Sequence, residues 1–425
     1  MISITSNALS IITKNTIITL IATGFMLGAW PALASHSNSS DTSNNNDSSG
    51  KSTASTYTGE VSGWLPWWTD SAGIKSATKN IKKIDTIYPF SFEVNASGEI
   101  IDKAGMGDKE WRDFIKLAKK NKVEVIPSIA WFDGDQIGMT LSDEDTRKDH
   151  IDEIVRIVKK GKYDGINIDY EGKNAENIND FSTFLKELKK KLKGKLLTCA
   201  IEARTPAVDL YKVVPNPLTY ANDYKAIGQY CDRIELMTYD QQHADLTLNV
   251  KRAALPYAPL ADNEWVEKVI KLAVADLPKD KVLVGVATYG RAWDITVAPG
   301  DYQDYTRVAS LNHPRIKELS DNIYKTPIGY STGGEAVMSY FPEDSVYKVL
   351  GSLPVPEGTP KGYENTARAL MFANMAQTSV KVRFITYNDA VSAQDKLNLA
   401  MKYGVRGVTF FKIDGEEDQN IWKLF

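Results

Sequence analysis

The sequence contains few of the residues that bind metals or form disulfide frameworks. It has two cysteines among 425 residues. No paired-cysteine motif and no glycine-rich phosphate loop is present. The four histidines show no ligand spacing: His36, His150, His243 and His313. We therefore expect no metal and no cofactor. Cys199 and Cys231 lie on or just before consecutive predicted strands, and we expect two buried free thiols, with one bridge as the alternative.

A strong net charge is also lacking. The formal net charge is −3, from 54 acidic and 51 basic residues. Proteins that bind nucleic acid normally carry a basic patch, so this balance gives no reason to expect a nucleic acid or a polyanionic substrate. The hydrophobic content of 43% is that of an ordinary globular protein with a large core.

The N-terminus has an apolar run that is too short to span a bilayer. Thr16–Trp30 comprises about 15 residues, whereas a transmembrane helix needs about 20. The run follows Lys14 and precedes a small-residue cleavage pattern, Ala32-Leu33-Ala34, which predicts a signal peptide over residues 1–34. A retained membrane anchor is the alternative. Residues 35–56 are rich in Ser and Asn and are predicted to form a flexible linker. We expect the mature chain to be exported, extracellular or associated with the cell wall, and not inserted in the membrane.

From residue 57 onward, strand-like runs alternate with helix-period segments, which is typical of repeated βα units. Eight strands are predicted, at 61–67, 86–92, 124–129, 165–170, 196–201, 233–239, 282–287 and 407–411. The clearest helices are 109–121, 142–160 with Ser142 as N-cap, 175–193, 265–275 and 390–403. Eight is the number that a closed (β/α)8 barrel of the α/β class requires. About 115 residues separate the last two strands, against ~30 for one βα unit, and this predicts an insertion over residues 292–382.

The fourth predicted strand, residues 165–170, delivers polar groups to one face and ends beside a carboxylate. Side chains alternate across a strand, so one face carries Asn167, Asp169 and Glu171, and the other carries Ile166, Ile168 and Tyr170. This pattern is typical of a barrel strand whose outer face packs on helices and whose inner face ends in an active site. A solvated acidic face is the alternative.

Four segments in order resemble motifs of glycoside hydrolase family 18, the chitinase-like retaining hydrolases. Residues 164–171 (DGINIDYE) resemble the D-G-x-D-x-D-x-E pattern of the fourth strand, and residues 234–240 (IELMTYD) the sixth-strand M-x-Y-D pattern. Residues 284–291 (VGVATYGR) and 407–411 (GVTFF) resemble the seventh and eighth strands. Asn167 departs from the family's middle Asp, and Phe411 stands where most members have Trp. The resemblance covers residues 57–425 and implies a TIM barrel with a small α+β domain in the insertion.

The resemblance also implies substrate-assisted catalysis. Glu171 matches the general acid, and Asp169 would orient the substrate's 2-acetamido group, whose oxygen attacks C1 in place of a protein nucleophile. Tyr239 and Asp240 match residues that hold the acetamide, and Met237 is expected to pack beneath them. For Tyr239, a core tyrosine with a satisfied hydroxyl is the alternative.

Asn167 is predicted to belong to the substrate-binding site as well. In family members with Asp at this place, two carboxylates can share a proton. An amide cannot ionise, so Asp169 and Glu171 are the only close acids that we expect on this face. We predict that Asn167 influences Glu171 mainly through Asp169.

Aromatic residues at the strand ends are predicted to form sugar subsites, because sugar rings bury their C–H faces against flat aromatic surfaces. The candidates are Trp64, Trp67, Trp68, Trp131 and Trp293, each with loop core as the alternative. Phe411 would form the floor under the cleaved sugar. Tyr289 and Arg291 are expected to line the cleft, although for Arg291 a structural ion pair is the alternative.

The sequence thus predicts a retaining hydrolase, monomeric, that cleaves β-1,4 bonds following N-acetylglucosamine. Chitin oligomers, peptidoglycan and an N-glycan core all fit as substrates. Asn167, the turn at residues 203–205 and the ending at residues 411–418 resemble the spore-germination branch of the family, which favours cell-wall glycan. A catalytically weak or inactive carbohydrate-binding lectin on the same barrel is the alternative. Retention of Glu171 argues against it.

Overall fold

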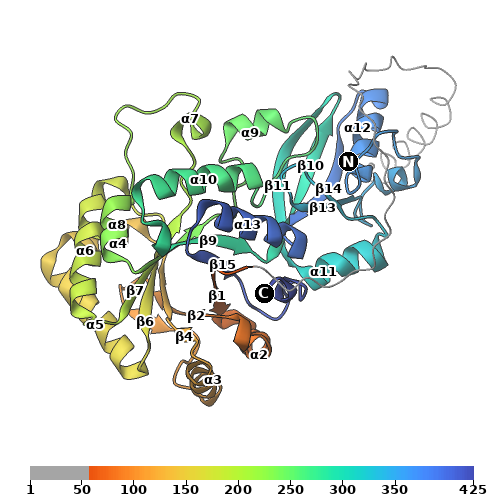
Figure 1. The fold of residues 1–425 in the computed structure, drawn as a ribbon. Helices are drawn as coiled ribbons and strands as arrows, with labels where there is room; N and C mark the ends of the chain where they lie inside the picture. The colour runs from red at the N-terminus through yellow and green to blue at the C-terminus, as the bar shows by residue number, and fades with distance from the viewer. Residues whose placement is uncertain (1–56) are drawn as a thin grey trace, which may run out of the picture.

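The computed structural model describes residues 57–425, and these form a closed barrel of eight parallel strands surrounded by helices (Figure 1). In chain order the strands are β1 (Glu60–Pro66), β2 (Thr86–Val94), β5 (Ser128–Trp131), β6 (Gly165–Tyr170), β7 (Leu196–Glu202), β8 (Arg233–Met237), β9 (Val282–Ala287) and β15 (Gly407–Phe411). The barrel closes because β1 pairs with both β15 and β2. The predicted (β/α)8 fold is confirmed. The predicted signal peptide and linker lie outside the described residues.

The third barrel strand differs from its prediction, because it is divided into two pieces. A short strand β4 (Glu124–Val125) pairs with β2, and β5 begins three residues later, at Ser128. Pro127 lies between the pieces and has no N–H to donate to a strand ladder. A hairpin strand β3 (Ile100–Asp102) extends the sheet beside β2.

Helices cover the outer face of the barrel. They are α2 (Asp70–Lys79), α3 (Lys109–Lys120), α4 (Gly134–Ser142), α5 (Glu144–Gly161), α6 (Ile178–Lys191), α8 (Tyr224–Tyr230), α10 (Asn263–Asp276) and α13 (Ala390–Tyr403), with short helices α7 (Ala207–Leu210) and α9 (Leu246–Lys251) in loops. The bounds of α13 match the prediction. The predicted N-cap at Ser142 is wrong: α4 ends there, and Asp143 caps α5 by accepting from the N–H of Thr146 at 2.9 Å.

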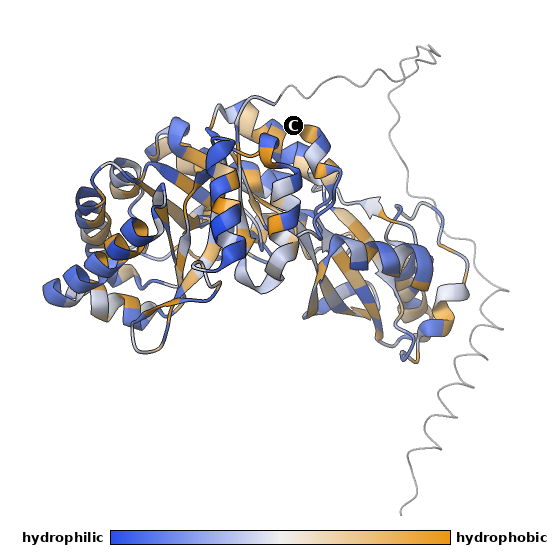
Figure 2. Ribbon diagram, turned by 90° about the horizontal axis from the view of Figure 1, so that it is seen from below, coloured by the Kyte–Doolittle hydropathy of each residue, from blue (hydrophilic) through white to orange (hydrophobic). Residues whose placement is uncertain are grey.

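The side chains of the barrel strands divide between two chemically different faces. Outward-facing residues such as Ile166, Ile168 and Tyr170 belong to the main hydrophobic core between strands and helices. Figure 2 shows hydrophobic residues along the strands and hydrophilic residues on the outer surfaces of the helices. The barrel interior, in contrast, holds fully buried polar side chains: Ser62, Ser128, Asn167, Thr198, Glu235 and Thr409. The alternation predicted for β6 is therefore present.

The insertion between β9 and β15 has its own antiparallel sheet, in the order β11-β10-β14-β13-β12. Its elements are β10 (Tyr289–Ala298), β11 (Asp301–Asn312), α11 (His313–Glu318), β12 (Gly329–Tyr330), β13 (Ala336–Tyr340), α12 (Glu364–Ala376) and β14 (Val380–Tyr387). The sheet begins and ends a few residues outside the predicted bounds of 292–382, because the ends of β10 and β14 pair with each other as a stem at Gly290 and Tyr387.

Cys199 and Cys231 form a disulfide, contrary to the expectation of two free thiols. Their Cα atoms are 6.1 Å apart, and both side chains are fully buried. The register explains this proximity. Cys199 on β7 lies opposite Ile234 on the neighbouring β8, and Cys231 precedes Ile234 by three residues, at the C-cap of α8. The bridge therefore joins two neighbouring βα units on the outer side of the barrel.

Over residues 57–425, we find no helix with the length and apolar character that a bilayer crossing requires. Within the same residues, no group of three or more His, Cys, Asp or Glu side chains is arranged to hold a metal ion.

Candidate active site

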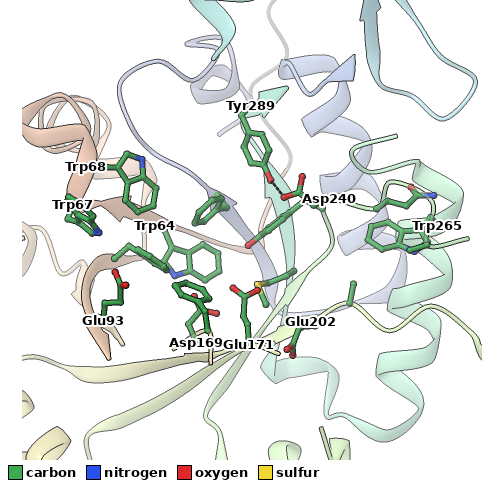
Figure 3. Close-up of a pocket in the computed structure, with 18 residues that line it drawn as sticks. Trp64, Trp67, Trp68, Glu93, Asp169, Glu171, Glu202, Asp240, Trp265 and Tyr289 are labelled. Atoms are coloured by element: carbon green, nitrogen blue, oxygen red, sulfur yellow. Dashed lines mark hydrogen bonds between the residues drawn. The ribbon is translucent and has the colours of Figure 1, made fainter. Parts of the chain in front are cut away.

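A cleft of about 560 Å³ opens at the carboxyl ends of the barrel strands (Figure 3), where TIM-barrel enzymes keep their catalytic groups. Its walls are aromatic and acidic. The lining includes Trp64, Trp67, Trp68, Phe90, Glu93, Asp169, Glu171, Glu202, Met237, Tyr239, Asp240, Trp265, Tyr289 and Phe411. The structure therefore brings together Asp169, Glu171, Tyr239 and Asp240 from two non-adjacent strands.

Asp169 and Glu171 stand at the end of β6, as their spacing predicted. Asp169 is 4% exposed, and its Oδ1 atom has no hydrogen-bond partner among the described residues. Burial, the neighbouring Glu171 and Glu202 raise the pKa of Asp169 well above its ordinary value. Burial and the charge of Glu202 also raise the pKa of Glu171. A raised pKa is what a general acid requires near neutral pH.

Glu202, at the end of β7, is a third carboxylate of this group, and sequence reasoning missed it. Its Oε1 accepts from the N–H of Gly172 at 3.1 Å, and its Oε2 accepts from Asn222 at 2.8 Å and from Lys173 at 3.4 Å. Burial alone would raise its pKa, but these donors hold it below the ordinary value. Glu202 is thus a fixed anion beside Asp169 and Glu171. Its position at the end of a predicted strand was the available signal.

Phe411 lies at the centre of an aromatic floor. Its ring stacks on Tyr239 with centroids 5.6 Å apart, and it meets Trp64 at 5.8 Å and Tyr289 at 6.3 Å edge to face. Burial raises the pKa of Tyr239 well above its ordinary value, so the hydroxyl stays protonated as a donor. The flat surface that these rings form suits the apolar face of a sugar ring.

Asp240 is held by an ion pair. Arg291 donates to both of its carboxylate oxygens, at 2.9 and 2.6 Å. The hydroxyl of Tyr289 donates to Oδ2 at 3.0 Å, as Figure 3 shows. Arg291 also donates to Ser310 of β11. Arg291 does not line this cleft but an adjoining one of about 600 Å³, which shares Trp68, Tyr289 and Phe411 with it.

Three predicted contact residues lie elsewhere. Trp131 is 1% exposed and packs against His150 and Tyr170 on the outer face of the barrel, because its position on β5 points toward α5. Trp293 is buried in the core of the insertion. Asn167 is fully buried below the cleft floor, where it bonds Ser128, Thr198 and Glu235. Trp131 and Trp293 therefore form no sugar subsite, and Asn167 is not exposed to a ligand.

Sequence reasoning also missed Trp265 and Glu235. Trp265 lies in the first turn of α10, donates its ring N–H to Thr205 at 2.8 Å and lines the cleft. Its place on an amphipathic helix gave no sign of this. Glu235 lies inside the barrel, and a charged residue between Ile234 and Leu236 on a buried strand was a usable signal. Met237, expected beneath Tyr239, lines the cleft itself.

Comparison with known proteins agrees with this geometry. The profile of glycosyl hydrolases family 18 matches residues 63–416. The chain belongs to this family. It is accordingly a glycoside hydrolase, chitinase-like and built on a TIM barrel.

Among its relatives, the uncharacterized glycosylase YvbX of Bacillus subtilis (strain 168) is 22% identical over 363 residues, which cover 83% of this chain and 87% of that protein. The cortical fragment-lytic enzyme of the same organism is 22% identical over 293 residues, covering 68% of this chain and only 56% of the relative. The crystal structure of the Bacillus cereus spore cortex-lytic enzyme SleL shares the fold with a TM-score of 0.61 at 20% identity, covering 86% of this chain and 73% of that one. These relatives support membership of the spore-germination branch.

Proposed function

We propose that the protein cleaves β-1,4 bonds following N-acetylglucosamine with retention, using the substrate's own acetamido group as nucleophile. The observation that carries this proposal is that the two further carboxylates whose charges act on Glu171, Glu202 and Asp240, are both engaged. Glu202 is bound by Lys173, Asn222 and the N–H of Gly172, and Asp240 is bound by Arg291 and Tyr289. An ordinary retaining glycosidase needs a free carboxylate about 5–5.5 Å from the acid, across the scissile bond.

In the proposed mechanism, Glu171 donates its proton to the glycosidic oxygen while that bond to C1 breaks. The acetamido oxygen of the same sugar attacks C1 and forms an oxazolinium ion. Asp169, whose Oδ1 has no hydrogen-bond partner within residues 57–425, accepts from the acetamide N–H and stabilises the developing positive charge. The hydroxyl of Tyr239 donates to the acetamide oxygen. Glu171 then takes a proton from the water that opens the oxazolinium at C1.

The proposed substrate is a cell-wall glycan that contains N-acetylglucosamine, and the protein would act outside the cell as a monomer. One relative is named a cortical fragment-lytic enzyme and one solved neighbour a spore cortex-lytic enzyme, and these names support this choice over chitin and N-glycan. The departures at Asn167 and at the chain ending pointed to the same branch.

The test is incubation with a chitotriose reporter and with purified peptidoglycan, followed by mass analysis of the products. The proposal expects reducing-end N-acetylglucosamine with retained configuration, inhibition by an oxazoline-mimicking thiazoline, and no reaction with cellulose oligomers or fully deacetylated chitosan. The Glu171→Gln variant is the control for contaminating activity. A covalent sugar ester trapped on a carboxylate of the protein would refute the mechanism, and binding without turnover would favour the lectin alternative.

A further inference from the structure

A fully buried carboxyl group, Glu235, lies inside the barrel beneath the cleft. It stands on β8 and is 0% exposed. The hydroxyl of Tyr88 on β2 donates to its Oε1 at 2.7 Å, and the amide nitrogen of Asn167 on β6 donates to its Oε2 at 2.9 Å. TIM-barrel interiors are filled mainly by bulky apolar side chains. A carboxyl in this layer, with both oxygens engaged, therefore calls for a role.

A chain of hydrogen bonds fixes the orientation of Asn167 toward Glu235. The ring N–H of Trp64, which lines the cleft, donates to Ser128 at 3.0 Å, and Ser128 donates to Oδ1 of Asn167 at 2.8 Å. The amide oxygen is thus occupied, and the amide nitrogen faces Thr198 at 2.7 Å and Glu235. The direct hydrogen-bond partner of Asn167 is therefore Glu235, whereas the sequence predicted only an influence of position 167 on Glu171 through Asp169.

The charges around Glu235 leave it able to ionise near neutral pH. Burial raises the pKa of Glu235 to about 7, while the Tyr88 hydrogen bond and the Arg233 cation on its own strand oppose the rise. Glu60 on β1 adds a further negative charge, and Arg233 is itself paired with Glu60 at 3.1 Å and with Glu124 on β4 at 2.6 Å. From β7 the hydroxyl of Thr198 accepts from the same amide nitrogen of Asn167 at 2.7 Å.

The layer above contains the catalytic pair. Asp169 follows Asn167 by two residues on β6, so the two Cα atoms are about 7 Å apart. Glu235 is one of the negative charges that raise the pKa of Asp169, after burial, Glu171 and Glu202. Asp169 and Glu171 in turn interact directly, so a charge beneath Asp169 reaches the general acid through it.

We propose that Glu235 is a positioning residue of the active site. From β8 it supplies the interior carboxylate that the motif at residues 164–171 lacks, because Asn167 stands there in place of Asp. Its negative charge beneath Asp169 favours the protonated form of the Asp169–Glu171 pair, so that the pair retains its proton to higher pH. The inference rests on the proposed function of Glu171 as general acid. It also gives Asn167 a role: the amide is the donor that orients this carboxylate.

The test is the pH profile of kcat/KM for the Glu235→Gln variant, which keeps the shape of the side chain and cannot ionise. Without the charge, the pair loses its proton at lower pH, so the alkaline limb moves down by about 0.5–1.5 pH units. Because Glu235 is protonated at low pH in the wild type, the acidic limb stays in place.

Glu335→Gln is the matched control. Glu335 is also fully buried, and burial raises its pKa to about 7, but it lies in the insertion and accepts from the N–H groups of Leu260 and Ala261. Its alkaline limb should not move.

The double variant Asn167→Asp with Glu235→Gln exchanges the carboxyl and the amide. Its alkaline limb should return to the wild-type pH or above it, because the charge now lies on the same strand as Asp169. Asn167→Asp alone places two carboxyls in hydrogen-bond contact, where they share a proton, and the acidic limb should move to higher pH.

An alkaline limb of Glu235→Gln at the wild-type pH, or an equal shift in Glu335→Gln, overturns the inference. If Glu235→Gln alone does not fold, the double variant is measured in its place. An alkaline limb of the double variant that lies below the wild-type pH then also overturns the inference. A wild-type protein that turns over no substrate refutes the proposed function instead. The charge of Glu235 is then tested by infrared titration of the protonated-carboxyl band, in which the variant must move the titration of Asp169 and Glu171 to lower pH.

Discussion

Replacing Glu202 by Gln is expected to move the alkaline limb of the kcat/KM profile about one pH unit to lower pH. Among the causes that raise the pKa of Glu171, the charge of Glu202 is second only to burial. Its bond of 3.1 Å to the N–H of Gly172, the residue after Glu171, makes the two side chains neighbours, and we take about 7 Å between their carboxylates for the estimate. Two unit charges at this separation interact by about 2.4 kcal/mol at an effective dielectric constant of about 20, and by about 0.6 kcal/mol in water. One pKa unit corresponds to about 1.4 kcal/mol, so a half-buried pair gives about one unit.

The assay is the kcat/KM of a chitotriose reporter between pH 4 and 10, measured for matched variants. Lys173→Met removes the cation that lowers the pKa of Glu171, so its alkaline limb should move in the opposite direction. Glu93→Gln, at the other end of the cleft (Figure 3), is the control with the same change of charge and should leave the limb in place. If Glu202→Gln leaves the limb unmoved or raises its pH, Glu202 does not act on Glu171 through its charge.

Three further predictions concern single features of the site and the fold. Glu171→Gln should lower kcat by about 10²–10⁴ without changing the unfolding temperature or the binding of oligosaccharide, and wild-type turnover would remove Glu171 from the mechanism. Phe411→Ala removes the ring that stacks on Tyr239, so kcat/KM should fall at least ~10-fold; a change below twofold would show that the ring bears no sugar. Replacing Cys199 and Cys231 together by Ala opens a loop with a sequence separation of 32, which should lower the free energy of unfolding by about 3–4 kcal/mol in a denaturant titration, and an unchanged value would contradict this loop-entropy estimate.

The fold was predictable because its signal repeats. Each βα unit restates the same pattern of an apolar strand, a turn and an amphipathic helix, and α13 was predicted to the residue. The errors arose where a local rule competed with another. Ser142 and Asp143 are both good N-caps, and the choice between them depends on where α4 ends. The disulfide depended on the register of β7 and β8, which spacing along the chain does not contain.

The position of the candidate site was predictable where one strand carries it, as with Asp169 and Glu171. It was not predictable where side chains from different strands meet across the barrel. Glu235 reaches Asn167 from two strands away, and Trp131 points outward although it ends a strand like the cleft residues do. The alternation of side chains along a strand shows only which residues of that strand share a face. Which face is inward on the next strand depends on barrel register.

The stem that joins the insertion to the barrel has a consequence for the order of folding. The last barrel strand, β15, must find β9 across roughly 120 intervening residues. Pairing of β10 with β14 brings Gly290 and Tyr387 together, and the flexible length that separates the two barrel strands falls to about 23 residues. Loop-closure entropy grows with the logarithm of length, so the formed stem lowers the cost of closing the barrel by about 1.5 kcal/mol. We therefore expect the sheet of the insertion to form before β15 pairs with β9. Substitutions that weaken the β10–β14 ladder should then lower the rate of barrel closure more than the stability of the folded barrel.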